Sequence, residues 1–387
     1  MDDDCLEELA ILLLLEGKKK KNCFRRSLSR QQRRNRSGYY RRRALQAPEN
    51  APFWNIYNSG QDDALITLTG FNHRYFAELH ALFQPLFDSY TPYSADGIRI
   101  KKKRARGGKK RCVTSITCLA LVLAWTRTRG SYSVLQIIFG LTKSPLSLWL
   151  CFGRRLLVKA LLHNDRAKVC LPTESELDEY CAIIRDKYPL LSKVWGAMDG
   201  LKLRLQCPDG DLKQSLFYNG WTHDHYTTNL FLFTPDGRIR SMYCNAPGCL
   251  HDSTLAYWGS VYDKVEELHG EHEVSIVVDS AFSKDRVNGL IKSNQNNTDR
   301  SGSQRQNSRL NRQATGLRQL SEWGMRGLQA SFPRLRDRLH YEEFGERKII
   351  IQLIVLLYNF RATSVGQNQI ASTFMPWLER TANHYST

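Results

Sequence analysis

The sequence predicts a mixed α/β protein in which a helical N-terminal region precedes a sheet flanked by helices. Apolar residues recur at helical spacing between residues 71 and 163. From Lys193 onward the pattern changes to short apolar runs separated by turn residues, which is typical of strands. Helical patterns return after residue 316. Strands followed by covering helices indicate an α/β domain.

The chain is expected to divide into four parts. Residues 1–60 combine an acidic start, a short leucine-rich segment and a basic run, so we expect a largely flexible arm. Phe71 to Phe87 spaces its aromatic and aliphatic residues as a helix does, which predicts a folded helical region over residues 61–165. The sheet-containing domain is expected over 166–370, and a tail over 371–387.

Basic residues are unevenly distributed. The 387 residues include 56 Lys and Arg against 38 Asp and Glu, a formal net charge of +18. Lys18–Arg43 holds 13 of the basic residues and Arg99–Arg111 holds nine. Such a surplus favours a polyanionic partner, because neutralising phosphates releases counterions. Nucleic-acid contact, nuclear import and merely solvated arms are all compatible with the two runs.

The ten cysteines show no even pairing, which indicates a reduced, intracellular compartment. The apolar run Ala10–Leu15 is too short to span a bilayer. We therefore expect a soluble protein without a membrane segment.

Residues 114–163 have the pattern of a helix-turn-helix. A first helix is expected over Ser115–Arg127, a second ends near Phe139, and Ser144-Pro145 opens a third with a favoured cap and first-turn proline. A recognition helix meets DNA at its start, so the residues predicted to contact DNA are Lys143, Ser144, Ser147, Arg154 and Arg155. A plain three-helix bundle fits the same pattern.

The following elements predict the sheet and its helical cover. VWGAMDG, LKLRLQ, NLFLFT, RIRSMYC and SIVV read as strands, with a hairpin turn at Pro235-Asp236-Gly237. A helical segment is expected from about Asp252 to Leu268. The polar stretch 294–311 predicts an exposed loop, and helices are expected over 316–331 and 347–361.

Three acids have positions that suggest chemistry. Asp199 ends one predicted strand, Asp279 ends another, and Glu322 lies in a helical stretch. An acid at the end of an apolar strand is costly to desolvate without a cation nearby. Carboxylates that meet repel one another, and Mg²⁺ or Mn²⁺ is a natural compensation because such cations prefer oxygen ligands. Asp199 also has the ordinary interpretation of a turn residue before glycine.

Residues 195 to about 370 resemble the nuclease domain of PIF/Harbinger-type transposases, which are DDE superfamily endonucleases. PGCLHDST resembles the family's P-G-S-x-H-D-S block, VVDSAF its G-D-S-G-Y block, and SEWGM its V-E-R-x-F-G block; AMDG and LLYNF also match. VVDSAF lacks the usual glycine and tyrosine, and SEWGM has tryptophan in place of arginine, but both blocks keep the acid.

The resemblance implies an RNase H-like sheet flanked by helices over residues 166–370. It implies that Asp199, Asp279 and Glu322 are catalytic and bind one or two Mg²⁺ or Mn²⁺ ions. Asp252 would be an auxiliary metal-binding acid, or equally a helix N-terminal residue. It further implies DNA partners (transposon ends and target), a Myb-like accessory DNA-binding protein, a homo-oligomer and action in the nucleus.

Three functions remain open at this point. The first is a transposase-type DNA endonuclease that cuts and joins strands with a divalent metal. The second is a domesticated, transposase-derived DNA-binding or interaction protein without catalysis. The third is a nonspecific nucleic-acid scaffold built on an unrelated sheet.

Overall fold

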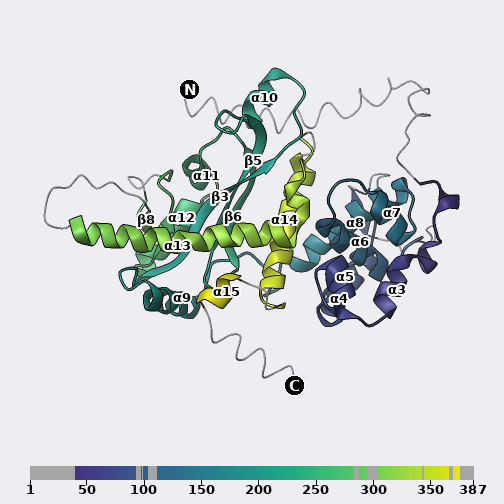
Figure 1. Cartoon of the computed structure of the whole chain (residues 1–387), viewed down its shortest axis with the longest axis horizontal. Coiled ribbons are helices and arrows are strands. Elements are labelled where there is room, and N and C mark those ends of the chain that lie inside the picture. Colours follow the sequence, from purple (N-terminus) through teal and green to yellow (C-terminus); the bar gives the residue numbers. More distant parts are fainter. Residues whose placement is uncertain are drawn as a thin grey trace.

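The computed structural model describes residues 40–92, 97, 99–102, 111–282, 287–293, 304–341, 344–365 and 369–374. A bundle of N-terminal helices lies at one end of the molecule and a sheet with its covering helices at the other (Figure 1). The mixed α/β fold predicted from the sequence is therefore confirmed. Most of the first basic run, part of the second, residues 294–303 of the predicted loop and most of the predicted tail lie outside the described residues.

The N-terminal bundle begins earlier than the sequence predicted. Its elements are η2 (Arg42–Ala44), η3 (Pro48–Asn50), α3 (Pro52–Asn58), α4 (Asp62–Thr69), α5 (His73–Ser89), β1 (Tyr90–Pro92), β2 (Ile100–Lys102), α6 (Ser115–Arg127), α7 (Ser133–Phe139) and α8 (Lys143–Leu161). Helix α3 lies in the stretch expected to be flexible, but it buries Phe53 completely. Residues 52–58 are thus part of the folded bundle.

The three helices of the predicted helix-turn-helix are present. Helix α6 has the predicted bounds, and the Thr114 side chain caps it by accepting from the Thr117 backbone N–H. Gly140 ends α7 in the left-handed conformation, and α8 leaves at 87° to α7. Helix α8 starts one residue before the predicted Ser144, with Thr142 at its N-cap. These helices fit either a DNA-binding motif or a plain bundle.

The central sheet has the mixed topology expected of an RNase H-like fold. Its strands are β3 (Val194–Arg204), β4 (Tyr218–Asn219), β5 (Asp224–Phe233), β6 (Ile239–Pro247), β7 (Ser275–Val278) and β8 (Leu290–Lys292). Strands β6, β5 and β3 form an antiparallel meander, and β3, β7 and β8 run parallel. VWGAMDG and LKLRLQ, read from the sequence as two runs, form the single strand β3.

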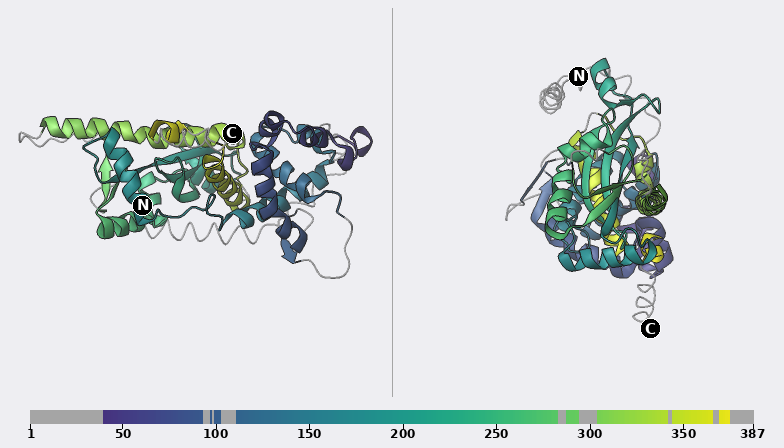
Figure 2. Two further views of the ribbon diagram at one scale, coloured as in Figure 1. Left: turned by 90° about the horizontal axis from the view of Figure 1, so that it is seen from below. Right: turned by 90° about the vertical axis from the view of Figure 1, so that its left-hand side faces the viewer.

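Helices cover both faces of this sheet. They are α9 (Glu174–Lys187), α10 (Asp211–Phe217), α11 (Asp252–Trp258), α12 (Val261–His272), α13 (Gln304–Ser331), η4 (Pro333–Arg336), α14 (Phe344–Ala362) and α15 (Gln369–Phe374). Residues of α9, α11 and α12 form a hydrophobic cluster with one face, whereas α13 and α14 pack against the other. Figure 2 shows α13 running along one side of the sheet layer.

Two helix predictions were wrong in their bounds. Helix α13 begins at Gln304, so residues 304–311 belong to a helix and not to the predicted loop. The segment predicted as one helix from Asp252 is two helices, because the chain breaks at Gly259 and Ser260, and Ser260 has a left-handed φ of 50°. A polar composition alone did not distinguish an exposed helix from a loop.

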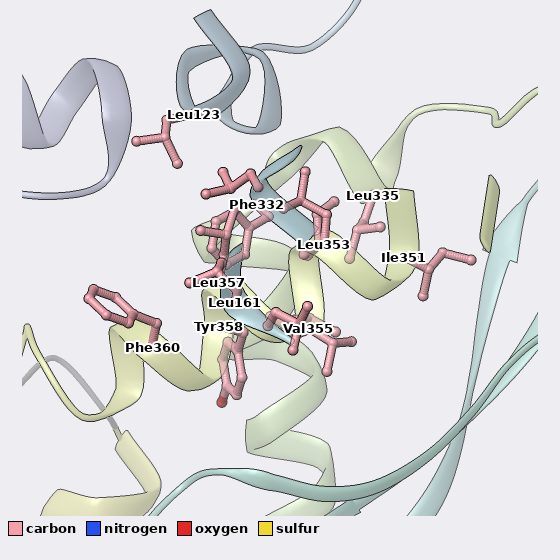
Figure 3. Close-up of a cluster of buried hydrophobic side chains, with 14 of the residues drawn as sticks. Leu123, Leu161, Phe332, Leu335, Ile351, Leu353, Val355, Leu357, Tyr358 and Phe360 are labelled. Atoms are coloured by element: carbon pink, nitrogen blue, oxygen red, sulfur yellow. The ribbon is translucent and has the colours of Figure 1, made fainter. Parts of the chain in front are cut away.

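The bundle and the sheet share one hydrophobic cluster. Figure 3 shows Leu123 of α6 and Leu161 of α8 near Phe332, Leu335 and a row of side chains from α14. This packing joins α8, the predicted recognition helix, to α14 of the sheet domain. The domain boundary near residue 165 therefore stays a prediction.

The LLYNF segment has a structural role. Asn359 is fully buried on α14; its side chain accepts from the Ile239 backbone N–H at 2.8 Å and donates to the Ile239 carbonyl at 2.9 Å. It thus satisfies backbone groups at the start of β6. A buried backbone N–H or C=O without a hydrogen-bond partner costs about 1–3 kcal/mol. Because Asn359 supplies partners for both groups of Ile239, it anchors α14 on the sheet.

No single helix in the described ranges is long and apolar enough to cross a membrane. The bent pair α7 and α8 meets that test only by length and composition.

Candidate functional site

Asp199 and Asp279 lie side by side on neighbouring strands, but Asp199 does not end its strand as predicted, because β3 continues to Arg204, whereas Asp279 directly follows β7. In the parallel pairing of β3 with β7, Met198 lies opposite Val278, and each is followed directly by an aspartate. Adjacent strands lie about 4.8 Å apart. Ala197 and Val277 face α13, whereas Met198 and Val278 face α9 and α12, so strand alternation places Asp199 on the α13 side.

Helix α13 contributes Glu322 to this side of the sheet. The helix approaches closely because residue 324, in the SEWGM block, is glycine: a Cβ there would lie 2.3 Å from the Phe233 ring. Glu322 lies about half a turn before this contact. The glycine of the motif thus sets how near the glutamate comes to the strand ends.

Arg318 connects two of the three predicted acids. Its guanidinium donates from Nη1 to Asp279 Oδ1 at 2.8 Å and from Nη2 to Glu322 Oε1 at 3.1 Å. Arg318 lies one turn before Glu322 on α13, on the same face of the helix. Asp279 also accepts a hydrogen bond from the Ser280 backbone N–H at 2.8 Å. The cation beside Asp279 in this structure is therefore an arginine.

Asp252 reaches the same end of the sheet from α11. It is the first residue of that helix, and its carboxylate lies against Gly200, where a Cβ would come within 2.5 Å of Asp252 Oδ2. The glycine that follows Asp199 thus leaves room for another acid. Both interpretations of Asp252, auxiliary acid and helix N-terminal residue, agree with this position.

The strand-end acids affect one another electrostatically. The pKa of Asp199 is raised to about 6: burial is the main cause and the charges of Asp252 and Asp279 add to it, while the hydrogen bond from the Gly200 N–H and the charge of Arg318 lower it. Burial also raises the pKa of Asp252; Asp279 adds to this, while Lys202 and His251 oppose it. Burial is the main cause of both shifts, because it disfavours the charged form of each carboxyl, and the neighbouring acids add to it.

The donor set suits a hard divalent cation, because it consists of carboxylate oxygens. In the part of the chain that the structure describes, however, no group of three or more His, Cys, Asp or Glu side chains is arranged to hold a metal ion. Asp279 and Glu322 point to Arg318 instead. The donor chemistry fits a divalent metal, and the present arrangement pairs two of the donors with an arginine.

A family model matches this region of the chain. Residues 198–359 match the family model of DDE superfamily endonucleases. The match spans β3 to α14 and includes all four acids, which supports a DDE transposase-like nuclease domain with an RNase H-like fold. Neither the curated proteins nor the solved structures yielded a match. The Harbinger subtype and the individual catalytic roles stay predictions.

The five residues predicted to contact DNA have different surroundings. Ser144 is exposed at the start of α8, and Lys143 and Ser147 are partly exposed beside it. Arg154 is only 5% exposed; it pairs with Glu346 of α14 at 3.4 Å and stacks 4.6 Å over the Trp125 ring. Arg155 pairs with the same Glu346. In this conformation both arginines join α8 to α14, and their predicted DNA contact is untested.

Sequence reasoning did not anticipate Arg318 or Gly200. Arg318 lies in an arginine-containing helix, where nothing in the spacing marks it apart from its position one turn before Glu322. Gly200 was interpreted only as part of a turn dipeptide, although it lies inside the continuous strand β3. A glycine inside a strand does indicate a close approach of another group, which here is Asp252.

Proposed function

We propose that this protein is a transposase-type DNA endonuclease that cuts and joins DNA strands with the help of Mg²⁺ or Mn²⁺. One observation carries the proposal: Asp199, Asp279 and Glu322, which lie far apart in the sequence, come from β3, β7 and α13 to one side of one end of the sheet. The match to DDE superfamily endonucleases covers the same residues.

Asp199, Asp279 and Glu322 would hold the metal, with Asp252 as an auxiliary ligand. When bound, such an ion would supply Lewis-acid chemistry suited to activating a water or a 3′ hydroxyl and to stabilising the leaving oxygen of a phosphodiester. The Gly200 N–H orients Asp199 at 2.8 Å, and the Ser280 N–H orients Asp279 at the same distance. These backbone donors hold one oxygen of each carboxylate, inside β3 for Asp199 and directly after β7 for Asp279.

The charge of the chain supports DNA as the substrate. A net charge of +18 favours binding to a polyanion, and Lys143, Ser144 and Ser147 at the start of α8 remain the proposed contacts of the bundle. Transposon ends and target DNA as ligands, a Myb-like accessory protein, a homo-oligomeric assembly and a nuclear location follow from the sequence resemblance and belong to this proposal.

The test is a nicking assay on supercoiled DNA with the full chain. We expect nicking to require Mg²⁺ or Mn²⁺ and to fall more than about 100-fold in Asp279→Ala, since even changes outside the ligand set cost metal sites about 10–100-fold. DNA binding, measured by fluorescence anisotropy, should survive. Asp186→Ala on α9 is the matched control, because Asp186 is exposed and distant from the strand ends. Equal nicking by Asp279→Ala and the parent would refute the assignment.

One observation favours a second function, a transposase-derived DNA-binding or interaction protein without catalysis. Arg318 pairs with both Asp279 and Glu322, and the described side chains form no cluster arranged for a metal. This alternative predicts DNA binding that is indifferent to divalent metals and no strand cleavage by the parent protein.

A further inference from the structure

Arg318 is the cation nearest to the predicted metal ligands. It is an incomplete counterion for them: its two terminal nitrogens bond Asp279 and Glu322, but its Nε–H is buried and has no hydrogen-bond partner. A buried, unpaired donor is costly. The order of the pair on α13, with arginine four residues before glutamate, is also the less favourable one for a helix.

Arg318 also leaves most of the local negative charge without a partner. Its guanidinium bonds Asp279 and Glu322, whereas Asp199 lies on the neighbouring strand and Asp252 lies against Gly200. Neither Asp199 nor Asp252 forms an ion pair with Arg318 among the described contacts. A divalent cation neutralises more of this charge, and its interactions with oxygen are shorter than those of a guanidinium.

The ion pairs are accessible to a competing cation. The side chains of Arg318, Asp279 and Glu322 are 24%, 32% and 36% exposed. Pairs with this exposure are weak, typically about 0–1 kcal/mol. Arg318 has a long, flexible stem on a helix surface, so its guanidinium can leave the carboxylates without moving α13.

We propose that Arg318 is a built-in placeholder: it occupies the cation position between Asp279 and Glu322 in the metal-free protein, and the divalent metal must displace it. The inference rests on the proposed metal-dependent function. Arg318 acts here as a positioning residue that keeps Asp279 and Glu322 facing each other and lowers the affinity for metal. It is not assigned a chemical step.

The experiment measures Mn²⁺ binding without DNA, by electron paramagnetic resonance of free Mn²⁺, on the full chain. Arg318→Met keeps the length of the stem and removes the charge. We expect it to bind Mn²⁺ at least about 10-fold more tightly than the parent, a gain of about 1.4 kcal/mol. Its melting temperature should be lower without metal and should rise more when Mn²⁺ is added.

Two further variants make the result specific. Arg312→Met removes the same charge from an exposed position on the same helix, about 9 Å away along the axis, and should bind Mn²⁺ as the parent does. Arg318→Gln provides a second, polar replacement, and far-UV circular dichroism confirms that each variant is folded.

The outcomes separate this inference from the proposed function. Tighter binding by both Arg318 variants but not by Arg312→Met supports the placeholder. Equal or weaker binding by the Arg318 variants, with saturable binding by the parent, overturns it and leaves the metal-dependent function intact. Saturable binding by none of the proteins overturns the metal site and the placeholder together.

Discussion

Two of the arginine–carboxylate clusters among the described residues have opposite balances of charge. Between α8 and α14, Glu346 receives Arg154 and Arg155, so two cations surround one acid. At the end of the sheet, Arg318 faces Asp279 and Glu322, with Asp199 and Asp252 nearby. The side chains of Arg154 and Glu346 are 6% and 8% exposed, against 24% to 36% for the Arg318 pairs.

The difference separates a structural cluster from a functional one. The Glu346 cluster is buried: the Trp125 ring covers the Arg154 guanidinium, and both arginines pair with the same carboxylate. The Arg318 cluster has an excess of negative charge and is open to solvent. Negative charge that the protein itself does not neutralise is evidence that an external cation binds there. A buried cluster whose charges pair with one another holds two elements together.

The largest expected effect on stability tests the structural cluster. Glu346→Ala leaves two arginines without their carboxylate, one of them buried, and should lower the free energy of unfolding by about 3–5 kcal/mol. In the same urea titration, Arg318→Met should change it by no more than about 1 kcal/mol. Glu267→Ala, at an exposed position of α12, serves as the control.

Similar losses for Glu346→Ala and Arg318→Met would remove the distinction between the two clusters. Both clusters would then be structural ion pairs, and the excess of acidic side chains around Arg318 would no longer be evidence for a cation site.

A smaller effect, visible in its pH dependence, tests the excess charge. Because the pKa of Asp199 is raised to about 6 in the folded protein, the folded state holds this proton more tightly than the unfolded state. The contribution of Asp199 to stability is then favourable below about pH 4 and is lost as the pH rises through about 6. Asp199→Asn keeps an acceptor for the Gly200 N–H and lacks this titration.

We therefore expect metal-free Asp199→Asn to be more stable than the parent at pH 7.5, by up to about 3 kcal/mol, since one pKa unit corresponds to about 1.4 kcal/mol. The advantage should disappear near pH 4. The measurement is the midpoint of urea unfolding at both pH values, with Asp186→Asn as the exposed control. An advantage that is equal at pH 4 and pH 7.5 would show that Asp199 is not perturbed.

Local sequence signals predicted the elements but not the packing between them. The helical spacing of Ser115–Arg127 and the apolar runs of β5 and β7 placed these elements correctly. The start of α13 was missed because its first turns are polar all round, and only the tertiary structure shows that the helix begins at Gln304.

The acids of the candidate site could be predicted from the sequence, whereas the part played by Arg318 could not. Strand ends followed by an aspartate are visible in the sequence, and the parallel register of β3 and β7 brings Asp199 and Asp279 together. The pairing of Arg318 depends on the rotation of α13 about its axis. Likewise, the pairing of Arg154 and Arg155 with Glu346 could not be predicted, because Glu346 lies about 190 residues away in the sequence.

The most direct test of the account is the anomalous scattering of a crystal of the protein soaked in Mn²⁺. The account predicts an anomalous peak in contact with the carboxylates of Asp199 and Asp279, with the Arg318 guanidinium turned away from Asp279 and Glu322. The contrary result is a site without a peak at saturating Mn²⁺, in which Arg318 still bonds both acids.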